Sequence, residues 1–454
     1  MKAQTRFTNY SSLLSHGNAK SRSAALDCLA AALDAADTYA GTHRVVRREG
    51  NTLHVGERAY DLSAPFAIYV AGAGKGSYPI VKALDEILGD RITEGIMLAK
   101  GEAAPLKHIT VMETSHPVPD ARSLAGGEIV QRMAGKVKPG DLVFACMTGG
   151  CSALMAVPVP GVTLEDKIAL NKLLLRTGAH ISEMNAVRKH VSLVKGGGLV
   201  KIFQPATVIT LTQHTTPDFL PWPDTSYPDP STFADAIQVL KNYDIWDPTP
   251  EGVKNYLLKG LVDPSLETPK TFENYDTYLL DTGNQRDACL AAVEKAKQLG
   301  YNAYVLSTKL EGESRDIGRG LAGIAKEIKL FDRPFAKPCV LASAGETTVS
   351  VRSANPGKGG PNQELVLGFA EGASRYEGLT MLSIDSEGTD GPTDIAGGIS
   401  DGETVDRARA LGLDVFTSLK NNDSSTLLEA LNDAVITGPT GTNVVNLRIL
   451  VVEE

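Results

Sequence analysis

The amino-acid sequence predicts an α/β fold of two domains, the first of them a doubly wound, Rossmann-like parallel sheet. The chain has 454 residues, which is long for a single hydrophobic core. Short apolar runs alternate with segments of helical periodicity, as in βαβ units whose parallel sheet is covered on both faces. The alternation pauses in a stretch rich in Pro, Asp and Thr at 244–274 and then restarts. We therefore expect one domain over 1–250 and a second α/β domain over 251–454, with a cleft between them.

The elements follow from apolar periodicity. An Ala- and Leu-rich helix is expected at 22–40. The first domain then has predicted strands at 66–71, 95–99, 108–112, 141–147 and 207–213, and predicted helices at 76–88, 120–134, 163–183 and 231–243. The second domain has predicted strands at 275–281, 302–307, 338–343, 346–352, 379–385 and 444–453, and predicted helices at 284–299, 314–330 and from 362. A loop is predicted at 386–402, and loops of that length are usually functional.

Composition narrows the class of protein. The net charge is −9, and no run of Lys or Arg marks a nucleic-acid surface. The five cysteines have no CxxC spacing, which argues against a disulfide framework and against structural zinc. No apolar stretch has the length of a signal peptide core or a membrane span. We expect a soluble, cytoplasmic protein that binds neither nucleic acid nor membranes.

The first motif is the segment IYVAGAGKGSYPI, a strand followed by a glycine-rich turn and a helix. A P-loop is excluded because Lys75 is followed by glycine, and a dinucleotide fingerprint fails at Ser77. The next strand also ends in Lys100, where a ribose-binding acid would be expected. What remains is an anion site made by Gly74, Lys75 and the start of a helix. The alternative is a tight turn with a solvated lysine.

A second strand-to-helix turn contains Gly149, Gly150, Cys151 and Ser152. Its backbone N–H groups and hydroxyl would again suit an anion. The nucleophile-elbow pattern G-x-S-x-G is not matched, which argues against a hydrolase. Cys151 is therefore interpreted as a small packing residue.

The third motif, NAVRKHVSLVKGGGLVK, places Asn185 one helical turn before Arg188 and ends in Lys195, Gly196 and Gly197. This arrangement is typical of a site that positions a carboxylate or phosphate. The alternative is a solvated helix face.

The second half of the chain contains acidic loops beside a Gly-Lys loop. The residues concerned are Glu346, Thr347, Lys358, Gly359, Gly360, Asn362, Gln363, Asp385 and Asp390. Carboxylates beside phosphates are the ligands that Mg²⁺ prefers, so we expect a site for a magnesium-bound nucleotide. The alternative is a set of Asp- and Gly-rich turns.

Seven of these segments together resemble the type-2 glycerate kinase family: AGAGKGS, SHPVPDARSLAGG, TGGCSALMAVPVPGVTLEDK, NAVRKHVSLVKGGGL, GETTVSVR with GKGGPNQE, SEGTDGPTDIAGG and TGPTGTNVVNLRI. Members of that family have a kinase domain followed by a MOFRL domain, and many have been labelled hydroxypyruvate reductases. The resemblance runs in order over nearly the whole chain. It implies phosphorylation of D-glycerate at its 2-hydroxyl, with ATP and Mg²⁺, in a cleft between two α/β domains.

The resemblance also implies roles for the motif residues. Catalytic roles fall to Lys75, Arg188 and Asp390. The substrate would contact Gly74, Gly149, Gly150, Cys151, Ser152, Asn185 and His214. The nucleotide would contact Lys195, Gly196, Gly197, Thr347, Lys358, Gly359, Gly360, Asn362 and Gln363, and the metal Glu346 and Asp385.

The sequence departs from the family pattern in two loops. Lys358 and Pro361 stand where arginines are usual, and the segment 212–227 keeps little of the family sequence and gains bulky residues. We therefore expect the acceptor to be glycerate or a longer or branched relative. An NAD(P)H-dependent hydroxypyruvate reductase and a catalytically altered small-acid binder are the alternatives. A homodimer is possible.

Overall fold

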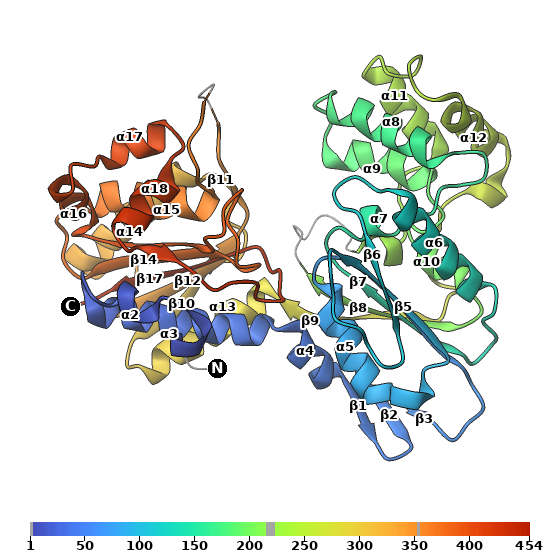
Figure 1. Ribbon diagram of the computed structural model, residues 1–454, viewed down its shortest axis with the longest axis horizontal. Coiled ribbons are helices and arrows are strands. Elements are labelled where there is room, and N and C mark those ends of the chain that lie inside the picture. The colour runs from blue at the N-terminus through green and yellow to red at the C-terminus, as the bar shows by residue number, and fades with distance from the viewer. Residues whose placement is uncertain (1–2, 215–222, 352–354) are drawn as a thin grey trace. The chain divides into compact units, whose positions relative to one another are not determined.

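The computed structural model describes residues 3–214, 223–351 and 355–454, apart from the side chain of His214. The chain forms two compact units (Figure 1). The middle unit is Thr38–Thr282, and the terminal unit combines Met1–Asp37 with Gly283–Glu454. Each unit is described by itself below.

The middle unit contains a sheet with the strand order β6-β5-β4-β7-β8-β9. Its strands are β4 (Ile68–Ala73), β5 (Glu94–Lys100), β6 (Thr110–Thr114), β7 (Leu142–Met147), β8 (Thr207–His214) and β9 (Thr277–Asn284). Strands β4 to β8 pair in parallel. Because the chain moves outward from β4 first through β5 and β6 and then through β7 and β8, the order reverses between β4 and β7. This is the topology of a doubly wound sheet, as predicted.

Residues of β4 alternate between two cores, as the period of a strand requires. Tyr69 and Ala71 pack on one face with residues of α6 (Ala121–Ala134) and α10 (Gly198–Ile202). Ile68 and Val70 pack on the other face with α5 (Ser77–Leu88). Both faces of the sheet are therefore covered, which confirms the predicted fold class.

A cluster of helices with its own apolar core completes the middle unit (Figure 1). It contains α8 (Leu164–Leu175), α9 (Ile181–His190), α11 (Phe233–Asn242) and α12 (Glu251–Val262). The single helix predicted at 163–183 is wrong: α8 and α9 are separated by a turn in which Gly178 has a φ of +72°. Glycine adopts this left-handed conformation without strain, so the turn ends α8.

The remaining elements of the middle unit are short. A meander of β1 (Val46–Glu49), β2 (Thr52–Val55) and β3 (Arg58–Asp61) follows α4 (Thr38–Val45), and it was not predicted. The others are η1 (Gly89–Arg91), α7 (Cys151–Leu154), η2 (Asp224–Ser226) and η3 (Pro264–Leu266).

The terminal unit has a mixed sheet in the order β10-β12-β17-β14-β15-β16. The strands are β10 (Asn302–Ser307), β12 (Cys339–Gly345), β14 (Leu379–Asp385), β15 (Gly397–Asp401), β16 (Ala434–Val435) and β17 (Asn446–Val452). One face packs on α3 (Ala19–Ala36) and α13 (Gln285–Gln298), and the other on α14 (Ser314–Phe331) and α15 (Pro361–Ala373). Shorter elements are α1 (Ala3–Arg6), α2 (Tyr10–Leu13), β11 (Gly312–Glu313), β13 (Thr347–Thr348), α16 (Thr404–Ala410), α17 (Val415–Lys420) and α18 (Ser424–Ala430).

Three features of the terminal unit differ from the expectations. The loop predicted at 386–402 contains β15, and the strand predicted at 346–352 is reduced to β13. The division expected between 1–250 and 251–454 also differs from the two units, because α3 packs against α13 and the sheet of the terminal unit. The alanine-rich surface of α3 provides the reason: small side chains allow the close approach of these two helices.

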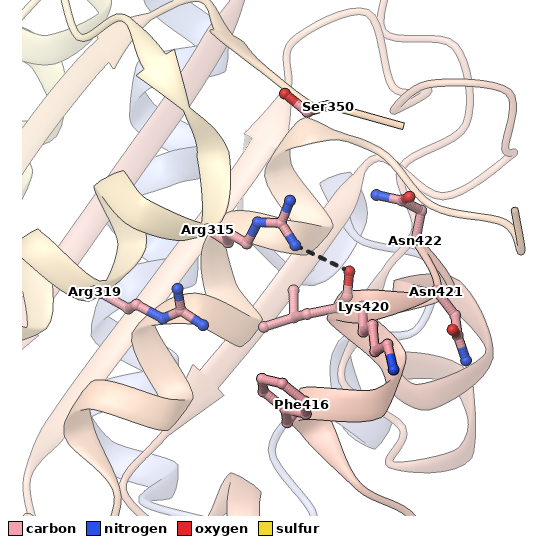
Figure 2. Close-up of a pocket in the computed structure, with 8 residues that line it drawn as sticks. Arg315, Arg319, Ser350, Phe416, Lys420, Asn421 and Asn422 are labelled. Carbon is pink, nitrogen blue, oxygen red and sulfur yellow. Dashed lines mark hydrogen bonds between the residues drawn. The ribbon is translucent and has the colours of Figure 1, made fainter. Parts of the chain in front are cut away.

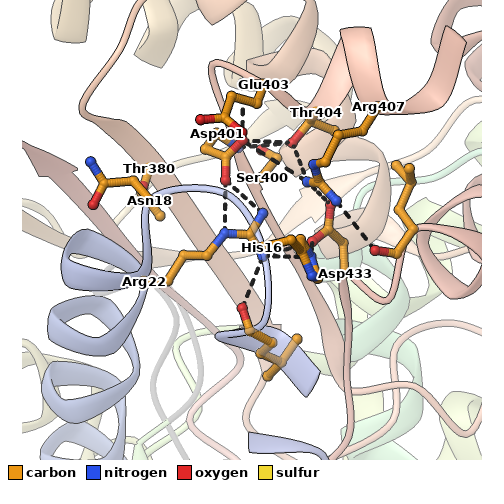
Figure 3. Close-up of polar contacts among 12 residues, drawn as sticks. His16, Asn18, Arg22, Thr380, Ser400, Asp401, Glu403, Thr404, Arg407 and Asp433 are labelled. Carbon is orange, nitrogen blue, oxygen red and sulfur yellow. Dashed lines mark hydrogen bonds and ion pairs between the residues drawn. The ribbon is translucent and has the colours of Figure 1, made fainter. Parts of the chain in front are cut away.

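Polar contacts reinforce the position of α3 (Figure 3). The guanidinium of Arg22 is fully buried and forms ion pairs with Asp401 at 2.6 Å and with Asp433 at 2.7 Å. It also donates to the carbonyl of Leu13 at 3.1 Å, and His16 lies 2.8 Å from Asp433. The N-terminal segment is thus joined to the end of the terminal sheet by charged groups. None of the helices described is both long and apolar enough to cross a membrane.

Candidate active site

The two predicted turns meet at the topological switch point of the middle sheet. The turn after β4 contains Lys75, and the turn after β7 begins at Thr148. The amide of Lys75 donates to the carbonyl of Gly149 at 2.8 Å, and the amide of Gly76 donates to Thr148 Oγ1 at 2.9 Å. Ligands of open α/β sheets bind at this position, beyond the carboxyl ends of the strands where the strand order reverses.

Contacts around Gly150 bring a third segment to the same place. Gly150 has a φ of +87°, and a Cβ added there would lie 2.9 Å from His116 Cδ2 and 3.5 Å from Lys75 Cγ. His116 belongs to the loop that follows β6. The glycine therefore allows His116 and the exposed side chain of Lys75 to approach the turn from both sides.

A cavity of about 610 Å³ opens beside these turns. Its walls come from the loop after β6, from α7, α8 and α9, and from the segment that contains Asp224 and Asp229. The lining includes apolar side chains, among them Pro117, Val118, Ile168 and Leu170. It also includes charged side chains. Such a combination of apolar wall and convergent polar groups is typical of a small-molecule site.

The charged part of the lining is rich in cations. Lys195 Nζ lies 2.5 Å from Asp224 Oδ2, and Lys189 Nζ lies 3.2 Å from Asp229 Oδ1. Arg188 also lines the cavity, and its buried Nε has no hydrogen-bond partner among the described residues. Burial lowers the pKa of Arg188, although the charge of Asp224 opposes the shift. An unsatisfied guanidinium nitrogen in a cavity favours an anionic ligand.

Lys167, on the first turn of α8, adds a cation that the motifs did not indicate. Burial lowers the pKa of Lys167 to about 7; the charge of Lys195 acts in the same direction, and Asp224 opposes it. Its helix begins at a capping box in which Thr163 and Asp166 exchange hydrogen bonds. This cap fixes the start of α8 and hence the place of Lys167.

Asp229 is fully buried and held by several donors. The hydroxyl of Ser231 donates to Oδ1 at 2.7 Å, and that of Thr268 donates to Oδ2 at 3.1 Å. Glu267 accepts from the amide of Thr268 at 2.8 Å and lies 2.9 Å from His190 Nε2. Burial opposes the ionisation of Glu267, but hydrogen bonds from Lys270 and Thr268 and the charge of His190 together lower its pKa to about 2. This network holds the segment that carries Lys189 against the cavity.

Cys151 starts the short helix α7 and is almost fully buried. Burial raises the pKa of its thiol to about 12, with a smaller contribution from Asp224. A thiol with such a pKa is a poor nucleophile at neutral pH. The interpretation of Cys151 as a packing residue is consistent with this environment.

The sequence-predicted residues of the middle unit fall into two groups. Those that line the cavity are Gly150, Ser152, Asn185, Arg188 and Lys195. Gly196 and Gly197 have left-handed φ angles and form the turn between Lys195 and α10, where Gly197 donates to the carbonyl of Asp224 at 2.9 Å. Gly74 also has a positive φ and packs against Thr148. His214 ends β8, but its side chain lies outside the described residues. Residues 215–222, which make up most of the divergent segment 212–227, also lie outside them.

In the terminal unit, Asp390 is 1% exposed and binds the start of α15. Its carboxylate accepts from the amides of Asn362 at 3.2 Å and Gln363 at 3.0 Å, and from Asn362 Nδ2 at 2.9 Å. Burial raises the pKa of Asp390, and these hydrogen bonds oppose the shift. The contacts favour a positioning role for Asp390, at the N-terminus of α15, and its catalytic role stays a prediction.

The glycines before α15 are required by packing. A Cβ at Gly359 would lie 2.2 Å from Ser424 Oγ, and one at Gly360 would lie 2.3 Å from Asp390 Oδ2. Lys358, next to them, is exposed. The glycine loop is therefore held close to α18 and Asp390, with its lysine directed to solvent.

The register of the terminal sheet relates the two predicted metal ligands. Gly345 of β12 pairs with Asn446 of β17, which pairs with Asp385 of β14. Glu346 follows Gly345, so Glu346 and Asp385 lie at one edge of the sheet, about 10 Å apart across two strand spacings. Among the residues that the structure describes, no three His, Cys, Asp or Glu side chains gather as a metal cluster.

Thr347 lies at the same edge. Its Oγ1 accepts from Arg448 Nη2 at 3.1 Å and from the hydroxyl of Ser314 at 2.9 Å. Arg448 is 1% exposed, and its Nε has no partner among the described residues. Burial lowers the pKa of Arg448 to about 10. A buried cation thus supports the edge that carries Glu346 and Asp385.

A second cavity, of about 410 Å³, lies in the terminal unit (Figure 2). Arg315 and Arg319 line it, with Phe416 and Lys420 opposite. Arg315 pairs with Glu313 at 3.1 Å, and Arg319 pairs with Glu371 at 2.7 Å. Within the described part of the chain, this lining includes none of the predicted nucleotide or metal residues. Its two arginines are already paired, so it is a weaker candidate for an anion site than the cavity of the middle unit.

Sequence reasoning missed His116, Lys167, Asp224 and Asp229 as lining residues of the middle cavity. A signal was present for three of them. His116 lies in SHPVPDARSLAGG and Lys167 ends TGGCSALMAVPVPGVTLEDK, both segments that carry the family resemblance, and Asp229 lies in the Pro-Asp-Pro with which the family pattern resumes. Asp224 lies in the divergent loop, and nothing in the sequence pattern indicated it.

Comparison with known proteins identifies the family. Two family models match the chain: a domain of unknown function, DUF4147, over residues 24–258, and the MOFRL family over residues 339–446. A glycerate 2-kinase of Pyrococcus horikoshii is 37% identical over 93% of this chain and 95% of that protein. The chain belongs to the glycerate 2-kinase family. This confirms the resemblance inferred from the motifs, the two-domain α/β fold and the assignment to small-molecule kinases.

Two further relatives cover most of the chain. The crystal structure of a glycerate kinase from Thermotoga maritima superposes with a TM-score of 0.83 at 34% identity, covering 94% of this chain and 97% of that one. A protein of Agrobacterium vitis named as a putative hydroxypyruvate reductase is 38% identical over 84% of this chain and 86% of its own length. The names glycerate kinase and hydroxypyruvate reductase therefore both occur among these relatives.

Proposed function

We propose that this kinase transfers the terminal phosphoryl group of ATP to the 2-hydroxyl of D-glycerate or of a longer or branched 2-hydroxy acid. The observation that carries the proposal is the cation-rich cavity at the switch point of the middle sheet, next to Lys75. A site of this charge suits an acceptor that carries a carboxylate. Family membership gives the reaction type.

In this proposal the middle unit binds the acceptor. Arg188 orients the carboxylate, Ser152 and Asn185 contact the hydroxyls, and Lys75 neutralises the charge of the group in transfer. Phosphoryl transfer requires little covalent chemistry from the protein, so positioning and charge neutralisation account for most of the catalysis. Lys75 and Arg188 are the catalytic residues in this sense.

In this proposal the terminal unit binds the nucleotide. Its support is the exposed Lys358 of the glycine loop. Thr347, Asn362 and Gln363 are buried and hydrogen-bonded, so in this proposal they hold the loops that contact the nucleotide. Glu346 and Asp385 would hold Mg²⁺; both are accessible, and oxygen ligands of this kind suit it. When bound, Mg²⁺ neutralises and orients the phosphates. Lys195 lines the acceptor cavity, and Gly196 and Gly197 form the turn that follows it, so a nucleotide contact for them stays a prediction.

The size of the cavity supports an acceptor larger than glycerate. Its volume of about 610 Å³ falls among pockets of about 300–1,000 Å³, which bind ligands much larger than a three-carbon acid. Apolar side chains also line the cavity, Pro117, Val118 and Ile168 among them, and a hydrocarbon extension would pack on them.

A coupled assay of ADP release over a panel of 2-hydroxy acids tests the proposal. The panel contains D-glycerate, L-glycerate and acids with longer or branched apolar chains. We expect phosphorylation of D-glycerate, and a higher kcat/KM for at least one longer acid. Turnover of D-glycerate alone would contradict the larger acceptor. Oxidation of NAD(P)H by hydroxypyruvate without ADP release would overturn the kinase proposal in favour of a reductase.

A further inference from the structure

The lining of the acceptor cavity has more cationic than anionic side chains. Among the described residues that line it, the cations are Lys167, Lys172, Arg188, Lys189 and Lys195, and the carboxylates are Asp224 and Asp229. Each of the two carboxylates already forms an ion pair: Asp224 lies 2.5 Å from Lys195, and Asp229 lies 3.2 Å from Lys189. Lys172 is exposed to solvent. Lys167 and Arg188 are left with no ion pair to any described residue.

Lys167 and Arg188 face the same carboxylate from two different helices. Both interact electrostatically with Asp224, Lys167 from α8 and Arg188 from α9. The buried Nε of Arg188 has no hydrogen-bond partner among the described residues. Both side chains are half-buried on the cavity wall, and an anion held between the two helices would give each of them the charged partner that it lacks.

We propose that Lys167 binds the acidic group of the acceptor jointly with Arg188 and takes up a proton as that anion binds. The inference rests on the proposed function only for the identity of the acceptor. The pocket, its unpaired cations and their arrangement on α8 and α9 do not depend on the reaction.

The protonation follows from the environment of Lys167. Burial lowers the pKa of Lys167 to about 7, so above pH 8 the amine is largely neutral in the free protein. An anion within about 4–6 Å favours the ammonium form and raises this pKa. Binding therefore draws a proton from the solvent, and by linkage the affinity for the anion falls as the pH rises above 7.

The cavity holds other titratable groups that must be separated from Lys167. Cys151, whose pKa is about 12, stays a thiol at pH 8.5. His116 also lines the cavity, so its contribution is measured as the proton uptake that remains when Lys167 is replaced. Proton uptake that is lost on replacing Lys167 therefore reports on Lys167.

Isothermal titration calorimetry at pH 8.5 tests the inference. D-glycerate and inorganic sulfate are titrated in two cationic buffers with different heats of ionisation, which gives the number of protons taken up. We expect the wild type to take up about 0.5–1 proton per anion. Lys167→Met should take up none and bind about tenfold more weakly. Lys167→Arg, which stays charged, should bind without proton uptake.

The control is Lys259→Met, which removes an exposed lysine of α12 outside the cavity and should leave both quantities unchanged. Thermal unfolding checks that each variant is folded, and Lys167→Arg carries the test if the Met variant is not. Wild-type proton uptake near zero, or an unchanged uptake in Lys167→Met, overturns the inference. A wild type that binds with proton uptake but phosphorylates no hydroxy acid overturns the proposed function alone.

Discussion

Lys195 Nζ and Asp224 Oδ2 lie 2.5 Å apart on the wall of the acceptor cavity, with each side chain little exposed. Lys195 follows α9, whereas Asp224 begins η2 within the divergent segment 212–227. Asp224 also acts electrostatically on Lys167, Arg188 and Cys151. One carboxylate therefore balances the cations that face an anionic ligand.

The Lys195–Asp224 pair gives two variants with opposite effects. Lys195→Met leaves the carboxylate of Asp224 unpaired beside the anionic ligand and should weaken D-glycerate binding. Asp224→Asn leaves Lys195 free to pair with the ligand and should strengthen binding at low salt. Binding by the double variant should lie near that of the wild type, with a coupling energy of about 0.5–3 kcal/mol. Calorimetry on the four proteins measures this cycle. Shifts of the same sign in both single variants would contradict the assignment.

Lys75 is expected to act on the rate more than on acceptor binding. Lys75→Met should lower kcat for phosphorylation about a hundredfold or more, as when one stabilising donor is removed from a transition state. Its Kd for the acceptor should change less, since Arg188 remains. Steady-state kinetics and calorimetry separate the two quantities. Lys100→Met, which removes an exposed lysine at the end of β5, is the control.

Gly150 and Gly149 form a matched pair for the turn after β7. Gly150 has a φ of +87° and would place a Cβ 2.9 Å from His116, whereas a Cβ at Gly149 meets nothing within 4 Å. Gly150→Ala should cost about 1–2 kcal/mol of unfolding free energy and reduce turnover, because the left-handed conformation disfavours alanine. Gly149→Ala should leave the free energy of unfolding unchanged, because nothing crowds a Cβ at that position. Urea denaturation and the ADP-release assay measure both; equal effects would refute the role of the turn conformation.

Glu267 makes the stability of the middle unit depend on pH. Its pKa is about 2 in the folded protein, below the ordinary value of 4.5, so its contribution is complete above pH 4.5 and is lost as the pH falls toward 2. Glu267→Gln should lower the free energy of unfolding by about 1–2 kcal/mol at pH 6. The difference from the wild type should shrink below pH 4.5 in urea titrations. Glu251→Gln, at an exposed site on α12, should show no such pH dependence.

Arg22 is expected to dominate the attachment of the N-terminal segment. Its side chain is fully buried, and so is that of Asp433, with 2.7 Å between the charged atoms (Figure 3). Arg22→Met leaves Asp433 with only His16 and Arg407 and removes the 2.6 Å partner of Asp401, so it should cost about 3–5 kcal/mol of unfolding free energy. Arg409→Ala breaks an exposed pair and should cost no more than about 1 kcal/mol. Denaturant unfolding of both variants provides the comparison, and similar losses would disprove the difference.

Much of the middle sheet was predictable because its central parallel strands are buried on both faces and therefore appear in the sequence as short continuous apolar runs. The turns at Lys75 and at Gly149–Ser152 were predictable too, since each ends an apolar strand and starts a helix. The break between α8 and α9 was missed although a signal was present: the leucine run ends at Leu175, and Gly178 follows it in the polar segment 176–180. The strand β15 was missed because Gly and Asp dominate its segment, and such residues are rare in strands.

The sequence by itself determined the α/β class, the two glycine turns and the family. These depend on local periodicity and on motifs whose order the chain preserves. Only the tertiary structure decided that α3 packs in the terminal unit, that Asp390 binds the start of α15, and that Lys167, Arg188 and Asp224 surround one cavity. These contacts join residues far apart in the chain. Their formation depends on how whole elements pack, and no local pattern of side chains encodes that packing.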